Sequence, residues 1–176
     1  MNKLLMTPLL CSSFLFLLAC GPNHTNSKPP ENNTAQQSSI QTLKQTYQLE
    51  SVTGLNEPWA IAILPDQRLL ITERKGQLKL FDPKTKTSLN VSGVPKVSYG
   101  GQGGLGDVVL HPDFRNNHRL YLSYATQGQG GYGAMISTAK LDLSNPQQPK
   151  LTDLKAIWQQ VPKVSGQGHY GHRMLF

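Results

Sequence analysis

The sequence predicts an all-β fold of the β-propeller class, because one motif of short strands occurs twice and then begins a third time. The two full copies span residues 58–82 and 101–124, and each has an apolar run, a Pro-Asp turn, Arg-Leu and a second apolar run. Pro65 and Pro112 stand at equivalent places in these copies. A repeat of about 40 to 50 residues built from short strands is the sequence signature of a propeller blade. A third copy opens at Gly166.

The individual strands follow from apolar runs that are bounded by turn residues. For the first unit we expect strands over residues 47–52, 59–64, 69–73 and 77–81. For the second unit we expect strands over residues 107–110, 120–124, 134–141 and 155–160. The run at 59–64 is apolar throughout, so we expect it to be buried, with Trp59 packed between blades. No stretch of ten or more residues has a convincing helical period.

Residues 1–19 have the layout of a signal peptide, with Lys3 followed by an apolar stretch that is too short to span a membrane. The stretch ends in Leu-Leu-Ala-Cys, which resembles a bacterial lipobox and implies cleavage before Cys20 and lipidation of that cysteine. Gly21 in place of aspartate favours, by resemblance to Gram-negative lipoproteins, a lipid anchor in the outer membrane that faces the periplasm. The alternative is an ordinary signal peptide with a chance cysteine.

Residues 20–45 are rich in polar residues and proline, so beyond the lipidated cysteine we expect a disordered tether. Residues 46–176 form the predicted propeller domain, which amounts to fewer than three blades of about 45 residues. A propeller closes with at least four blades. We therefore expect the first two blades and the start of a third, a truncated domain that is inactive on its own. Either the natural protein is longer, or this chain is a degenerate product.

The formal net charge of +7 is scattered along the chain, with no run of five or more basic residues and no interleaved aromatic side chains. This pattern argues against a nucleic-acid partner and for a solvated basic surface near anionic lipid. Cys11 is removed with the signal peptide and Cys20 is lipidated in this interpretation. No thiol then remains for a disulfide, a metal site or nucleophilic catalysis.

Three glycine-rich loops match the pattern G-x-G-x-x-G, starting at Gly101, Gly128 and Gly166. A nucleotide-binding loop leads into a helix, whereas extended residues follow here, so we interpret these glycines as turn residues. The first and third loops each precede the first strand of a blade, which lines the channel of a propeller. Gln102 and His169 are therefore expected to face one cavity, as a hydrogen-bonding amide and a general base. The alternative is that both are solvated loop residues.

Five motifs in order, PWAIAILPD, LLITER, VPKV with GQGGLGDVVLHPDF, RLYLSY and GHYGHR, carry a family resemblance. Residues 46–176 resemble the N-terminal part of the soluble pyrroloquinoline quinone (PQQ)-dependent aldose sugar dehydrogenases, or glucose/sorbosone dehydrogenases. The resemblance implies a longer, six-bladed propeller in which His169 takes the proton of the anomeric hydroxyl and a hydride passes to PQQ. It places Gln102 at the same cavity and assigns Arg173 to substrate or cofactor binding, with a structural role as the alternative. It also implies calcium, whose ligands, with most of those for PQQ, lie beyond Phe176, so no metal ligand is expected in this chain.

Two residues depart from the family pattern. Gly168 stands where the family often has an acidic or amide residue, and His172 stands where glycine is usual. A bulky side chain at position 172 is expected to crowd the start of the strand. The leading hypothesis is an oxidoreductase that takes electrons from aldose sugars and passes them to an unidentified acceptor. The alternative is a non-enzymatic propeller lipoprotein that binds a partner or glycan in the cell envelope.

Overall fold

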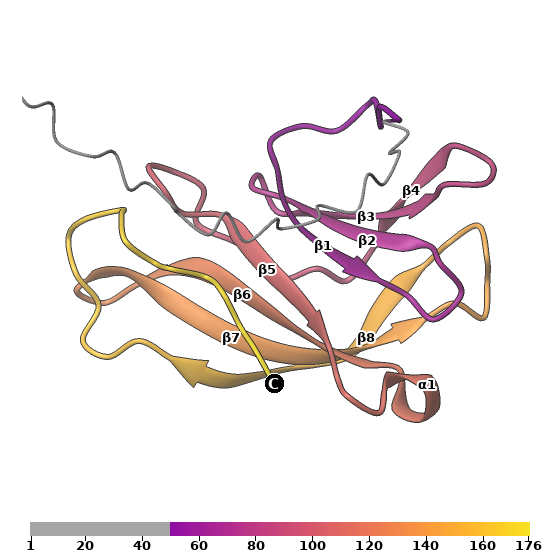
Figure 1. Cartoon of the computed structure of the whole chain (residues 1–176). Helices are drawn as coiled ribbons and strands as arrows, with labels where there is room; N and C mark the ends of the chain where they lie inside the picture. Colours follow the sequence, from indigo (N-terminus) through magenta and orange to yellow (C-terminus); the bar gives the residue numbers. More distant parts are fainter. Residues whose placement is uncertain (1–49) are drawn as a thin grey trace, which may run out of the picture. The chain divides into compact units, whose positions relative to one another are not determined.

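The computed structural model describes residues 50–176, which form two four-stranded antiparallel sheets (Figure 1). In each sheet the strands pair in chain order, as they do in a propeller blade. The first sheet consists of β1 (Pro58–Ile63), β2 (Leu69–Glu73), β3 (Gln77–Asp82) and β4 (Thr87–Val91). The second sheet consists of β5 (Leu105–Leu110), β6 (Arg119–Gly128), β7 (Gly131–Asp142) and β8 (Lys150–Gln159), with the single helical turn α1 (Phe114–Asn117) between β5 and β6.

The predicted signal peptide, the lipidation of Cys20 and the tether lie outside the described residues. Within residues 50–176 no helix has the length and the apolar character that a membrane crossing needs. The all-β prediction is confirmed, and β2 has the predicted bounds. The two blades lie side by side because the chain folds each repeat into its own meander before it starts the next.

Three parts of the strand prediction are wrong. Strand β4 was missed because its sequence, TSLNV, is largely polar; the strand exists because it pairs with β3. The described part of the run at 47–52, Glu50–Val52, is not a strand. The start of the third repeat, residues 171–176, forms no strand within the described chain, and its first two residues, Gly171 and His172, have left-handed backbone conformations. A strand needs a neighbouring strand that satisfies its backbone N–H and C=O groups. An alternating pattern of apolar and polar residues does not by itself supply that neighbour.

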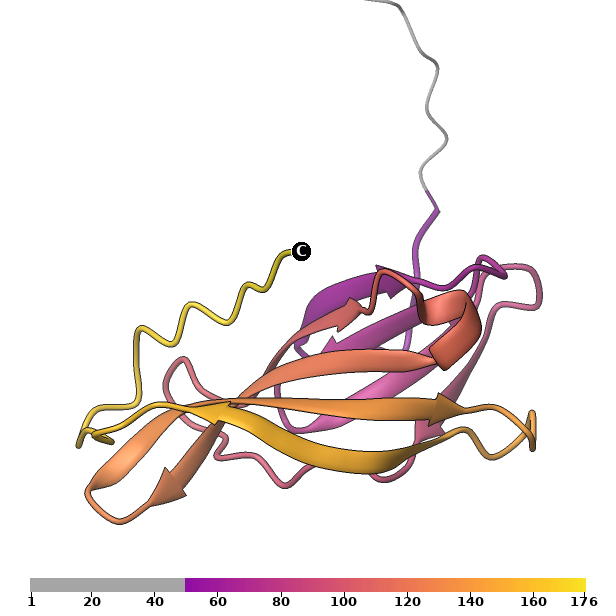
Figure 2. The same ribbon diagram turned by 90° about the horizontal axis from the view of Figure 1, so that it is seen from below.

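The hydrophobic core lies between the two sheets, where β5 packs against β1 and β2 (Figures 1 and 2). Leucines from both sheets are fully buried in it, namely Leu64, Leu70, Leu78, Leu120 and Leu122. A buried hydroxyl joins the sheets, because Thr72 Oγ1 donates a 2.7 Å hydrogen bond to the carbonyl oxygen of Gly106. This contact sets the start of β5 against the middle of β2.

Strand β1 is buried on one face only, contrary to the expectation for the run at 59–64. Trp59, Ile61 and Ile63 are exposed by 49%, 61% and 63%, whereas Ala62 and Leu64 point into the core. Successive side chains of a strand point to opposite faces, and β1 is the edge of its sheet. The prediction that Trp59 packs between blades is therefore wrong for the described chain, where its ring meets His172 at a 6.0 Å centroid distance.

After β8 the chain turns back along the second sheet, as the yellow trace in Figure 1 shows. Tyr132 and Val164 exchange two backbone hydrogen bonds of 2.7 and 2.9 Å. Farther along, the N–H of Gln102 donates to the carbonyl oxygen of Gln167 at 2.8 Å, and the N–H of Met174 donates to Asp107 Oδ2 at 2.9 Å. The returning segment thus brings the third glycine-rich loop to the first.

Candidate functional site

The two glycine-rich loops that were predicted to converge are in direct contact. The N–H of His169 donates a 2.7 Å hydrogen bond to Gln102 Oε1, and the N–H of Gln102 donates to Gln167 in the same segment. Gly101 makes this approach possible, because a Cβ on it would overlap the carbonyl oxygen of Gln167. The alignment of the repeats therefore predicted that the loops of Gln102 and His169 lie together. The chemical roles of the two side chains stay predictions.

The contact fixes which way the Gln102 amide points. Only the oxygen of a carboxamide can accept a hydrogen bond from a backbone N–H. Gln102 Oε1 is therefore turned toward His169, and Nε2 has its two hydrogens left to donate. The amide can act as a donor to a hydroxyl or carbonyl oxygen of a bound molecule.

The surroundings of His169 leave room for a ligand. Its side chain is exposed, and its backbone has a φ of 60°, a left-handed conformation that is uncommon for a residue with a side chain. A Cβ on Gly168 would have Gln102 as its nearest neighbour at 3.7 Å, and one on Gly166 or Gly171 would meet nothing within 4 Å. The space that an acidic or amide residue often fills in the family is open here.

His172 is accommodated in a way that the sequence did not show. The residue is buried, with 7% of its surface exposed, and has a φ of 62°, which suits the glycine that is usual in the family. Its ring occupies the space beside Gly106, where a Cβ would overlap it. Ser123 Oγ donates a 2.6 Å hydrogen bond to the His172 carbonyl oxygen. Burial lowers the pKa of the imidazole below its ordinary 6.5, and the nearby Asp107 carboxylate opposes that shift.

Arg173 lies at a smaller hollow of about 320 Å³, which is lined by Trp59, Ala60, Asp107, Gly171 and Arg173. Its guanidinium is 3.8 Å from the carboxylate of Asp107, and its side chain is 76% exposed. The Asp107 side chain is buried and also accepts hydrogen bonds from the N–H groups of Val108 and Met174, at 3.0 and 2.9 Å. Asp107 thus anchors the segment that carries His169 and Arg173, and the role of Arg173 toward a ligand stays a prediction.

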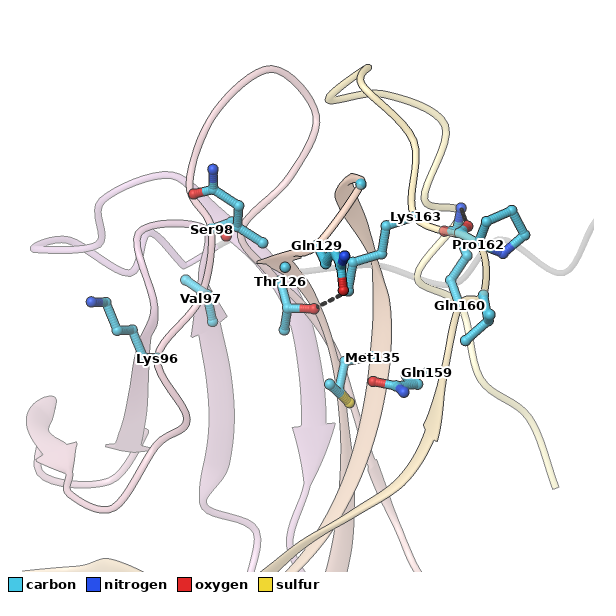
Figure 3. Close-up of a pocket in the computed structure, with 14 residues that line it drawn as sticks. Lys96, Val97, Ser98, Thr126, Gln129, Met135, Gln159, Gln160, Pro162 and Lys163 are labelled. Atoms are coloured by element: carbon cyan, nitrogen blue, oxygen red, sulfur yellow. Dashed lines mark hydrogen bonds between the residues drawn. The ribbon is translucent and has the colours of Figure 1, made fainter.

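A larger hollow of about 1140 Å³ lies between the segment before β5 and the ends of β6, β7 and β8 (Figure 3). Lys96 and Lys163 are the ionisable residues of its lining, and Lys163 Nζ donates a 2.7 Å hydrogen bond to Thr126 Oγ1. Neither Gln102 nor His169 lines it. Its lining contains no histidine and no carboxylate that could act as a general base.

Two consecutive four-stranded antiparallel meanders define a class of protein, the β-propellers, whose blades have this strand order. The sequence pattern of the Glucose / Sorbosone dehydrogenase family matches residues 55–176. The chain belongs to this family.

Individual relatives agree with this assignment. Aldose sugar dehydrogenase YliI of Escherichia coli is 43% identical over 126 residues, which are 69% of this chain and 33% of that protein. The soluble aldose sugar dehydrogenase of Escherichia coli in its apo form superposes with a TM-score of 0.64 at 42% identity, over 69% of this chain and 35% of that one. The PQQ-bound aldose sugar dehydrogenase of Streptomyces coelicolor gives a TM-score of 0.57 at 32% identity, over 65% and 34%. The chain spans about a third of the length of these relatives.

Sequence reasoning missed the residues that hold the two loops in place. Asp107 was taken only as the start of a strand, and Arg74 and Glu57 were not considered. The only signal for Arg74 was that it lies in the LLITER motif, which contributed to the family resemblance. That signal is weak, because the motif does not indicate what the side chain contacts. A polar residue inside an otherwise apolar strand, as Asp107 is in β5, is also a signal that a buried partner exists.

Proposed function

We propose that the full protein is a PQQ-dependent dehydrogenase of aldose sugars, with its site at the Gln102–His169 contact. The observation that carries the proposal is the hydrogen bond of 2.7 Å between the two loops, which holds the backbone of His169, a residue with an exposed side chain, to the Gln102 amide. The family supports oxidation of sugars, and the PQQ-bound relative supports the cofactor. The acceptor of the electrons and the particular sugar are not identified by these residues.

The described residues match PQQ in their hydrogen-bonding chemistry. PQQ carries carboxylates and carbonyl oxygens, which are acceptors, and Gln102 Nε2 and the Arg173 guanidinium are donors. Arg173 lines a hollow of about 320 Å³ together with Gly171, and a Cβ on Gly171 would meet nothing within 4 Å. Calcium has no such match, since no three histidine, cysteine or carboxylate side chains within residues 50–176 are placed to share a metal ion. We therefore derive no step that uses calcium.

In the proposed reaction His169 accepts the proton of the anomeric hydroxyl as the C1–H bond breaks. The sugar becomes a lactone, and bound PQQ supplies the acceptor for the hydride. Gln102 orients the reacting oxygen or a cofactor carbonyl through Nε2, because Oε1 is engaged by His169. A positioned base contributes about 100- to 10,000-fold to such a rate.

The experiment is dye reduction by the full protein supplied with an aldose. The proposal expects reduction that depends on both the sugar and added PQQ. Dye reduction that proceeds equally without PQQ, or an absence of sugar-dependent reduction in a protein shown to bind PQQ, would contradict it and favour the non-enzymatic alternative.

For the N-terminal part, we propose that Cys20 is lipidated and holds the protein at the outer membrane, on the periplasmic side. The lipobox-like run Leu-Leu-Ala-Cys and the polar tether over 20–45 support this. An anchored enzyme with a tether can oxidise sugars that reach the periplasm.

A further inference from the structure

We infer that Arg74 is a positioning residue, which holds the backbone on both sides of Gln102 so that its amide faces His169. The guanidinium Nη2 donates to the carbonyl oxygens of Gly101 and Gly103, at 2.5 and 3.3 Å. These are the two residues that flank Gln102. One side chain of the first blade therefore fixes the loop that carries the amide, and this inference rests on the function proposed above.

Arg74 is itself held by a second set of contacts. Its Nη1 donates to Glu57 Oε2 at 3.1 Å, and its guanidinium lies 5.4 Å from the centre of the Tyr99 ring. The Tyr99 hydroxyl donates to both oxygens of Glu57, at 2.8 and 3.1 Å. The hydrogen bond from Tyr99 lowers the pKa of Glu57, so the carboxylate stays ionised beside the guanidinium. Glu57 and Tyr99 therefore fix the direction in which Nη2 points.

The backbone of Arg74 ties the same loop a second time. The N–H of Leu105 donates to the carbonyl oxygen of Arg74 at 2.9 Å, and a Cβ on Gly104 would overlap that carbonyl. The N–H of Arg74 in turn donates to the carbonyl oxygen of Glu57 at 3.0 Å. The end of the loop is therefore hydrogen-bonded to the backbone of Arg74, directly after β2. The middle of the loop is hydrogen-bonded to the Arg74 side chain.

Arg74 acts through the loop and not on a ligand. Two of its nitrogens are engaged by protein acceptors, and its side chain is only 23% exposed. A lysine has a single ammonium group and cannot bridge a carboxylate and two carbonyls with the same geometry. A displaced amide loses the hydrogen bond that it would make to the reacting oxygen or to a cofactor carbonyl. Loss of the clamp should therefore weaken catalysis by releasing Gln102.

The test compares Arg74→Ala, Arg74→Lys and Arg74→Ala combined with Gln102→Ala in the full protein. Arg68→Ala is the matched control, because Arg68 makes an ion pair with Asp66 at 2.7 Å on the surface of the same sheet. We expect Arg74→Ala to lower kcat/KM by about 2- to 10-fold, no more than the loss of one hydrogen bond that Gln102→Ala causes, and Arg74→Lys by less. Added to Gln102→Ala, the substitution should cost little more, because residues that act through one group are not additive. If Arg74→Ala lowered kcat/KM by the same factor in the wild-type protein and in Gln102→Ala, the inference would be overturned.

Hydrogen exchange supplies a readout that needs no activity. The amides of Gln102 and Gly103 are protected by bonds to the carbonyl oxygens of Gln167 and Gly100, each of 2.8 Å. Arg74→Ala, and Arg74→Lys if the first variant does not fold, should speed their exchange, whereas Arg68→Ala should not. Unchanged exchange in a folded Arg74 variant would overturn the inference. A protein without sugar oxidation but with this exchange pattern would overturn the proposed function alone.

Discussion

The N–H of His169 donates a 2.7 Å hydrogen bond to Gln102 Oε1 across 67 residues of sequence. The bond joins the loop before β5 to the segment that returns after β8. It also engages the oxygen of the Gln102 amide, so that Nε2 keeps its hydrogens to donate. Removal of a hydroxyl proton, as proposed for this site, requires a base, and the exposed side chain of His169 is the candidate.

Replacing His169 by alanine should reduce turnover by about 100- to 10,000-fold, the contribution of a positioned base. Gln102→Ala should cost less, on the order of the 0.5 to 1.5 kcal/mol of one net hydrogen bond. Tyr132→Ala is the control, because the bridge of this residue to Val164 uses backbone atoms only. Steady-state dye reduction by the full protein at saturating sugar gives the ranking. A His169→Ala variant with normal turnover, beside an inactive Tyr132→Ala variant, would move the site away from the loops.

Stability should decline below about pH 6.5 because of His172. Burial lowers the pKa of this imidazole in the folded state below the 6.5 of the exposed group. The unfolded chain therefore binds the proton more readily, and the free energy of unfolding falls as the pH drops from 6.5 toward the folded-state pKa. His172→Asn, which tolerates the left-handed backbone, should show a flatter profile between pH 7.5 and 5. Urea denaturation measures the free energy of unfolding of the wild type and of His172→Asn at each pH. If this free energy depended on pH in the same way in both proteins, the account would be contradicted.

Asp107 should be worth more to stability than an exposed aspartate. Its carboxylate accepts from the N–H groups of Val108 and Met174, so Asp107→Ala leaves buried donors without partners at a cost of about 1 to 3 kcal/mol. Asp66→Ala removes an exposed pair with Arg68 and should cost about 1 kcal/mol or less. Urea denaturation of both variants measures the difference. Equal losses would mean that the returning segment is not anchored by Asp107.

The sequence predicted the repeat and the convergence of the loops that carry Gln102 and His169, because equivalent positions of a repeat occupy equivalent places in the fold. It did not predict β4, whose polar sequence becomes a strand only through pairing with β3. The prediction that Trp59 is buried between blades was wrong. An apolar run does not indicate which face of an edge strand packs against another part of the protein. Sequence reasoning also missed Arg74, since the acceptors of that side chain are backbone carbonyls from another repeat, which leave no residue pattern.

Lipidation is predicted for Cys20, which follows the lipobox-like run. Growth with a radiolabelled fatty acid should label the wild-type protein and leave Cys20→Ala unlabelled. The match between the apolar stretch, the cysteine and the polar tether is the reason for the expectation. Equal labelling of the two proteins would indicate an ordinary signal peptide or another acylated group.

The fit of His172 against Gly106 gives the last prediction. A Cβ on Gly106 would overlap the imidazole, although the backbone of Gly106 lies outside the left-handed region and admits alanine. Gly106→Ala should therefore destabilise the fold by about 1 to 3 kcal/mol, as overpacking does. In a His172→Gly background the ring is absent and the backbone strain at a φ of 62° is relieved, so the same substitution should cost much less.

Urea denaturation of the wild type, the two single variants and the double variant closes this cycle. A coupling of about 0.5 to 3 kcal/mol between the sites is expected for residues in contact. Gly168→Ala is the control, because its Cβ would sit 3.7 Å from Gln102 in ordinary contact. If Gly106→Ala cost the same with and without the imidazole, the ring would not fill that space. The departure from glycine at position 172 would then have to be accommodated by movement of the returning segment, which would also shift His169 relative to Gln102.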